Sequence, residues 1–116
     1  MQFNVKNDIG FSIISLEGDF LSEGEQGELR KKVHTLVDQG KTRLIIDLTG
    51  SKHINSCGLG ALVCAYTTLR RAGGDLRLAG VGQSVEELLK ITKLTMILNI
   101  SPTVEQAIAE YRSQMH

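Results

Sequence analysis

The chain has 116 residues, with 13 basic and 13 acidic side chains and therefore a formal net charge of zero. This length fits one small domain, so we expect residues 1–116 to form a single domain. The balanced charge provides no basic stripe for nucleic acid, and the apolar runs are too short to cross a bilayer. We therefore predict that the chain neither binds nucleic acid nor inserts into a membrane.

The first elements in chain order are two strands and a helix. Phe3 and Val5 alternate with polar neighbours, a turn follows, and residues 11–16 form a second strand-like run. Two such runs joined by a short turn predict a hairpin. The next segment has one apolar helical face, ends at Gly40, and has a capping-box spacing at its start. The face consists of Leu29, Val33, Leu36 and Val37, and the capping pair is Ser22 and Glu25.

The stretch from Leu44 to Gly60 organises the rest of the chain. It begins as a buried strand, predicted over residues 42–48, and is broken by polar residues and glycine. A helix is then predicted over residues 57–72, with Asn55 and Ser56 where it begins. Both residue types are favoured N-caps, and a helix N-terminus also stabilises anions. The hydroxyl of Ser56 can therefore cap the helix or carry a phosphate.

Further strand and helix patterns follow. Residues 75–79 predict a strand, and Ser84 with Glu87 repeats the capping-box spacing before another helix. A short strand is predicted from Leu94 and residues 96–98, whose apolar side chains we expect in the core, with an exposed partner patch as the alternative. Ser101 and Pro102 are predicted to begin the last helix, as N-cap and first residue.

The alternation predicts an α/β fold. We expect a mostly parallel sheet of about five strands, beginning with the hairpin and covered by about four helices. One core is predicted to contain Ile45, Ile46, Leu48, Ile54, Leu59, Leu62, Val63, Leu76, Leu78 and Leu88.

Cysteine and histidine positions give no metal or redox motif. Cys57 and Cys64 lie two turns apart on one predicted helix, roughly 10 Å, which is too far for a disulfide. Free thiols, and an N-terminus without the pattern of a signal peptide, favour a cytoplasmic location. No cofactor or metal is predicted.

The motif formed by Asp47-Leu48-Thr49 and the segment Ile54-Asn55-Ser56-Cys57-Gly58-Leu59-Gly60 resembles the signature of the STAS domain. More narrowly, it resembles that of bacterial anti-sigma factor antagonists. Gly18-Asp19 and the segment from Leu76 to Gly80 also fit, so the resemblance covers the whole chain.

The resemblance implies a protein that binds an anti-sigma factor with serine kinase activity and so releases a sigma factor. The kinase then phosphorylates the serine after the family's aspartate, which here is Ser56, and a cognate phosphatase reverses this. The partner-binding surface is predicted to include Asp19, Lys52, His53, Asn55, Ser56, Cys57 and Gly58. Two positions depart from the pattern, because Asn55 replaces the aspartate and Cys57 replaces a Ser or Thr.

Other interpretations remain open at these positions. Ser56 can be only a helix cap, which would suit an adaptor that binds a transport or stress-signalling complex without being switched. Asp47 can be compared with the phosphoacceptor of a receiver domain, but the acidic pair of such a domain is missing. An enzyme using Cys57 or Ser56 as nucleophile is the third function class, and we predict no enzyme because no general base is evident.

Overall fold

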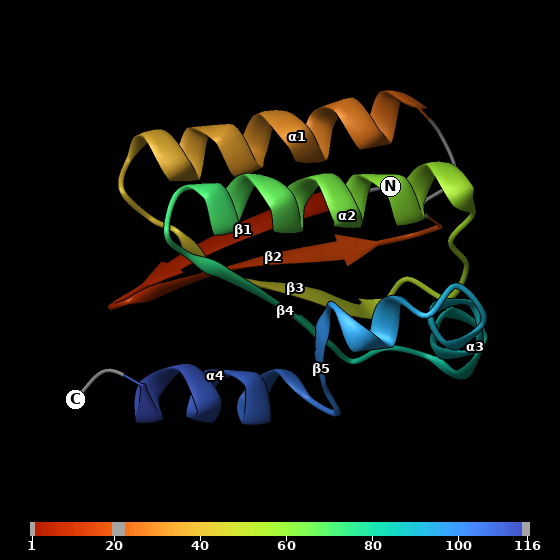
Figure 1. Cartoon of the computed structure of the whole chain (residues 1–116). Coiled ribbons are helices and arrows are strands. Elements are labelled where there is room, and N and C mark those ends of the chain that lie inside the picture. Colours follow the sequence, from red (N-terminus) through yellow and green to blue (C-terminus); the bar gives the residue numbers. More distant parts are fainter. Residues whose placement is uncertain (1, 20–22, 115–116) are drawn as a thin grey trace.

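The computed structural model describes residues 2–19 and 23–114, which form one five-stranded sheet with helices on both faces (Figure 1). The strand order follows the chain. The strands are β1 (Gln2–Asp8), β2 (Phe11–Glu17), β3 (Arg43–Gly50), β4 (Asp75–Ala79) and β5 (Asn99–Ser101). The helices are α1 (Glu23–Asp38), α2 (Ser56–Arg71), α3 (Gln83–Ile91), the 3₁₀ helix η1 (Leu94–Met96) and α4 (Val104–Ser113).

The sheet is mixed but mostly parallel, as the sequence predicts. β1 and β2 form the antiparallel hairpin, and β2, β3, β4 and β5 pair in parallel. Parallel neighbours need crossover connections, which α1, α2 and α3 provide. The carboxyl ends of β2, β3 and β4 therefore lie at one edge of the sheet, where the loops leading into α1, α2 and α3 begin.

The sheet separates two hydrophobic cores. Ile46 and the other side chains on its face of β3 pack against α1, α2 and α3, whereas Ile45 points to the opposite face and packs with α4. The prediction that Ile45 and Ile46 share one core is wrong, because successive side chains of a strand point to opposite faces and both faces are covered here. Ile54 and Leu88 pack against the first core while partly buried, and Val63 is only half-buried.

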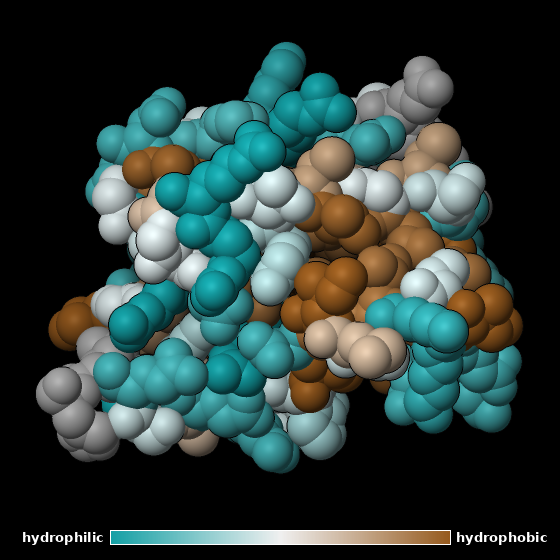
Figure 2. All heavy atoms as spheres, in the orientation of Figure 1, coloured by the Kyte–Doolittle hydropathy of each residue, from teal (hydrophilic) through white to brown (hydrophobic). Residues whose placement is uncertain are grey.

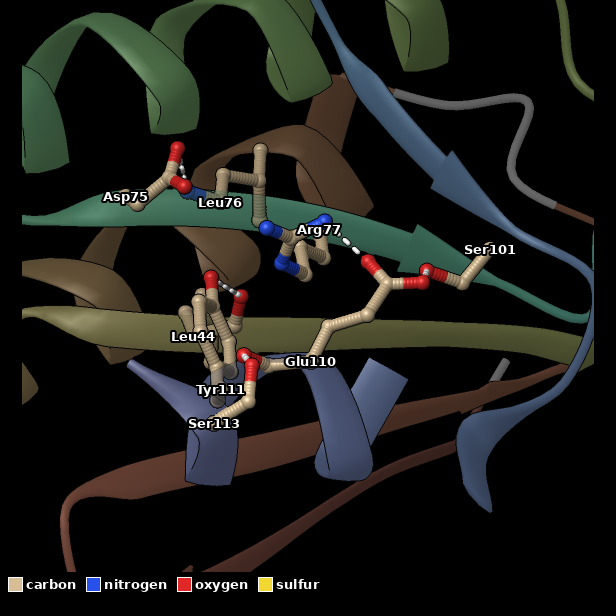
Figure 3. Close-up of polar contacts among 8 residues, drawn as sticks. All are labelled: Leu44, Asp75, Leu76, Arg77, Ser101, Glu110, Tyr111 and Ser113. Atoms are coloured by element: carbon tan, nitrogen blue, oxygen red, sulfur yellow. Dashed lines mark hydrogen bonds and ion pairs between the residues drawn. The ribbon is translucent and has the colours of Figure 1, made fainter. Parts of the chain in front are cut away.

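Hydrogen bonds of Tyr111 and Glu110 connect helix α4 to strands β3, β4 and β5 (Figure 3). The Tyr111 hydroxyl donates to the backbone carbonyl of Leu44 at 2.8 Å, and the Arg77 guanidinium lies 5.2 Å from the centre of the Tyr111 ring. Arg77 also donates to Glu110, whose other carboxylate oxygen accepts from the Ser101 hydroxyl at 3.2 Å. Burial raises the pKa of the Tyr111 phenol, and the nearby charge of Asp75 adds to the effect.

Two predicted helix starts are each wrong by two residues. Ser101 belongs to β5 and is buried, and Thr103 caps α4 by accepting from the Gln106 amide at 3.2 Å. Ser84 lies inside α3, which begins at Gln83. The Glu87 carboxylate there accepts from the Gln83 side chain at 3.5 Å, so it does not complete a capping box. The capping pair predicted at α1 includes Ser22, which lies outside the described residues.

The apolar return after α3 is a 3₁₀ turn rather than a strand. Lys93 adopts a left-handed conformation with φ of 61°, which ends α3 and starts η1. Met96 is 83% exposed and Ile97 is 52% exposed, so the prediction that they are core residues is wrong. Leu94 packs against the first core.

We expect Tyr111→Phe to lower the free energy of unfolding by about 1 kcal/mol near neutral pH, because a buried hydrogen bond is lost. Its raised pKa also predicts a pH dependence. Above about pH 10 the phenol ionises in the unfolded chain but not in the folded one, so its contribution to stability falls as pH rises. Urea unfolding near pH 7 and at about pH 10.5 should show a larger decline for the wild type than for Tyr111→Phe. Equal declines would contradict this role, since Tyr66 is common to both proteins.

Candidate functional site

Asp47 lies in the carboxyl-terminal half of β3, where both oxygens of its carboxylate accept hydrogen bonds. One carboxylate oxygen accepts from the Thr49 amide at 2.9 Å and from its hydroxyl at 2.6 Å, and the other accepts from the Ser15 hydroxyl at 3.3 Å. Both oxygens are therefore engaged within the sheet, one by Thr49 of the same strand and the other by Ser15 of β2. This local role accounts for Asp47 without the phosphoacceptor function of a receiver domain.

A close approach between two loops holds this edge of the sheet together. Gly80, directly after β4, has φ of +67°, and a Cβ built on it would lie 2.0 Å from the Thr49 hydroxyl oxygen. Any larger residue would collide there, so glycine is needed for the loops after β3 and β4 to meet. The contact between Gly80 and Thr49 therefore holds the end of β3, from which the segment to α2 begins.

Helix α2 begins with Asn55 as its N-cap. The Asn55 side-chain oxygen accepts from the Gly58 amide at 3.1 Å, and its backbone carbonyl accepts from the Leu59 amide at 2.9 Å. The predicted capping role of Asn55 is confirmed. Ile54, directly before it, packs against the first core and anchors the loop.

Ser56 is the first residue of α2, and its side chain is exposed. Within the described part of the chain its hydroxyl forms no hydrogen bond, because the capping position belongs to Asn55. The interpretation of Ser56 as the helix cap is therefore wrong. The structure leaves this hydroxyl open to solvent at the helix terminus.

The electrostatics at this terminus favour an anion. The first turn of α2 contains no acidic residue, and the positive end of the helix dipole lies here. Asn55 already uses the Gly58 and Leu59 amides, so the Cys57 amide is the donor best placed for a group on Ser56. Gly58 itself is buried and offers little surface of its own.

Asp19, Lys52 and His53 are exposed and lie in loops at this edge of the sheet. The Gly18 amide donates to the Gly50 carbonyl at 3.0 Å, which sets the loop containing Asp19 beside the end of β3. Lys52 and His53 line a hollow of about 380 Å³ that extends toward the first turn of α3. Ser56 does not line this hollow. The predicted site residues therefore form two groups, Lys52 and His53 in the hollow and residues 55–58 at the start of α2.

The two thiols form no disulfide with each other. Cys57 is half-buried, Cys64 is exposed, and both are free. No group of three or more His, Cys, Asp and Glu side chains within residues 2–19 and 23–114 could hold a metal ion.

Three exposed apolar side chains lie at the end of α3 and around η1, and we define Ile91, Met96 and Ile97 as the apolar patch. Figure 2 shows an apolar, hollowed area between α2 and the segment that contains α3 and η1. The exposure of Met96 and Ile97 agrees with the alternative that the sequence analysis gave for this segment, an exposed partner patch. Exposed apolar clusters of this kind mark surfaces for protein contact.

The fold and the exposed helix start define a class of small α/β domains that present a polar helix terminus at one edge of a mostly parallel sheet. The chain belongs to the STAS domain family, whose model matches residues 2–107. None of the described helices is long and apolar enough to span a membrane.

Relatives within this family share a name. BtrV of Bordetella bronchiseptica, provisionally named an anti-sigma factor antagonist, is 26% identical over 106 residues, covering 91% of this chain and 90% of BtrV. The anti-sigma-B factor antagonist of Bacillus subtilis is 32% identical over 80 residues, covering 69% of this chain and 72% of that protein.

Solved structures with the same fold include a Thermotoga maritima protein that is provisionally named an anti-sigma factor antagonist. Its TM-score is 0.87 at 23% identity, and the match covers 95% of this chain and 94% of that one. The phosphorylated form of Bacillus SpoIIAA matches with a TM-score of 0.74 at 20% identity, covering 94% of this chain and 98% of SpoIIAA. At these identities the likeness establishes the fold.

We expect Asn55→Ala to lower the free energy of unfolding by about 0.5–2 kcal/mol, because the Gly58 amide loses its acceptor. Asn55→Asp is the matched control, since aspartate also caps helices and should retain most of the stability. Urea denaturation of the three proteins measures both effects. If Asn55→Ala were as stable as the wild type, the cap would not contribute to stability.

Proposed function

We propose that this chain is an anti-sigma factor antagonist switched by phosphorylation of Ser56. It binds an anti-sigma factor of the serine kinase type in the cytoplasm and so releases a sigma factor. The kinase partner phosphorylates Ser56 from its own ATP, and a cognate phosphatase removes the phosphate. This chain then needs no nucleotide or metal of its own.

The observation that carries the proposal is the division of roles between Asn55 and Ser56. Asn55 caps α2, and the Ser56 hydroxyl is exposed and forms no hydrogen bond within the described part of the chain. A kinase can reach such a hydroxyl without breaking a capping interaction. The names of the relatives support the same function.

A phosphate on Ser56 would act on the partner more than on the fold. It adds about −1.5 to −2 charges at neutral pH and three acceptor oxygens. The dipole of α2 and the Cys57 amide can stabilise that charge, so the domain stays folded. The partner must then desolvate the phosphate or repel it with acidic groups, and binding weakens.

In this proposal Asn55 determines how fast Ser56 is phosphorylated. It replaces the aspartate of the family pattern, and the exchange removes a carboxylate next to the acceptor serine. If the family's carboxylate assists phosphoryl transfer, this chain is phosphorylated more slowly than its relatives. A slow switch would hold the protein in its binding form for longer.

The switch is tested by incubation with the candidate kinase and ATP, followed by mapping of modified peptides. We expect one phosphate at Ser56, none in Ser56→Ala, and faster transfer in Asn55→Asp. Ser56→Asp should fold normally and bind the kinase roughly 5–150-fold more weakly. Ser113→Asp, the same change in an exposed serine of α4, is the matched control and should bind like the wild type.

Two outcomes would count against the switch. Stoichiometric phosphate at another residue would reject Ser56 as the acceptor. Tight binding with no phosphate after long incubation would favour the adaptor function, in which the domain binds its partner constitutively.

We also predict the surface that meets the partner. It comprises the exposed residues Asp19 and Lys52, the start of α2 around Ser56, and the apolar patch of Ile91, Met96 and Ile97. Backbone amide shifts on adding the kinase should concentrate there. Shifts confined to α4, on the opposite face of the sheet, would contradict the proposed surface.

A further inference from the structure

A groove of about 380 Å³ lies between α1 and α2, and neither Ser56 nor the loop residues Lys52 and His53 line it. Its floor includes three buried apolar side chains, Val33, Ala61 and Ala65. Pockets that bind small molecules have volumes of roughly 300–1,000 Å³, with apolar walls and a few polar groups. The groove is at the small end of this range.

The groove exists because the facing helix surfaces carry small residues. α2 presents Gly60, Ala61 and Ala65 toward this side. A Cβ built on Gly60 would come no closer than 3.9 Å to the Gln26 side-chain nitrogen, and one built on Gly27 would meet nothing within 4 Å. Small residues on α2 therefore leave space for the groove above the buried side chains of its floor.

Two arginines give the rim of the groove positive charge. Arg30 lines it from α1 and Arg71 from α2, and both are exposed. The exposed side chain of His34 also lines the groove. None of the described residues that line the groove is acidic. Gln26 and Thr68 add polar groups that can donate hydrogen bonds.

Within the described part of the chain, Arg30 and Arg71 have no acidic side chain within ion-pair distance. Several other basic side chains do have acidic partners: Lys32 with Glu28 at 4.0 Å, Lys90 with Glu86 at 3.4 Å, Arg112 with Asp8 at 3.8 Å, and Arg77 with Glu110. Unpaired positive charge therefore gathers beside an apolar floor, although the whole chain has a net charge of zero.

We propose that this groove binds a small amphipathic carboxylate. A guanidinium group such as that of Arg30 or Arg71 matches a carboxylate in charge and can donate two hydrogen bonds to it, and the apolar floor accepts a short hydrocarbon tail. An inorganic anion would leave the floor uncovered, and an apolar molecule without charge would leave the cations unpaired. Ser56 does not line the groove, so this site is independent of the proposed phosphorylation.

The first test is an amide-shift titration of the whole chain with octanoate. We expect saturable shifts in α1 and α2 around Val33, Ala61 and Ala65. Acetate, which has the charge without the tail, and octylamine, which has the tail with the opposite charge, should each bind at least roughly fivefold more weakly. Equal binding of the three compounds, or shifts centred on Ile91 and Met96, would overturn the proposal.

Matched variants test the cationic rim. We expect Arg30→Gln and Arg71→Gln each to weaken octanoate binding, by roughly fivefold at most for one exposed charge, and the double variant to weaken it further. Arg112→Gln makes the same change on α4 and should bind octanoate like the wild type. These arginines are exposed, so unfolding by urea should be little changed in every variant. Unchanged octanoate binding in the double variant would contradict the assigned site.

Cys64 provides a separate measurement because its exposed thiol lines the groove. In a Cys57→Ser background, saturating octanoate should slow the reaction of Cys64 with a neutral pyridyl disulfide, and acetate at the same concentration should not. An unchanged rate with octanoate would place the ligand elsewhere.

Discussion

The burial of β3 on both faces is the constraint on which the rest of this structure depends. Leu44, Ile45 and Ile46 have no exposed surface. A strand of this kind must lie inside the sheet with helices on both sides, because its alternating side chains need two apolar environments. Helices α1, α2 and α3 cover one face, and α4 covers the other through the hydrogen bond from Tyr111 to the Leu44 carbonyl.

The site is a consequence of the same strand. Asp47 and Thr49 form hydrogen bonds within the last part of β3, and the short loop after Gly50 leads to Asn55 and Ser56 at the edge of the sheet. At that point two adjacent polar residues take different roles. Asn55 accepts the hydrogen bond of the Gly58 amide in the first turn of α2. Ser56 faces solvent at the positive end of the helix dipole, and the neutral Asn55 side chain adds no negative charge there.

Net charge describes this surface poorly. The chain is neutral overall, yet the first turn of α2 lacks acidic residues and the groove between α1 and α2 is lined by unpaired cations. Both features depend on which side chains the helices bring together. The exposed apolar side chains of Ile91 and Met96 lie on either side of one left-handed residue, Lys93.

The sequence by itself determined the element order, the mostly parallel sheet and the family resemblance, because hydrophobic period is a local property. It placed Asn55 and Ser56 at the start of a helix, and only the structure decided that Asn55 is the cap. The structure also decided that Ile45 belongs to a second core, because that depends on α4 packing against the far face of the sheet. The 3₁₀ turn was missed because its apolar residues also fit a strand, and the groove was missed because its residues come from two helices that are separate in the sequence.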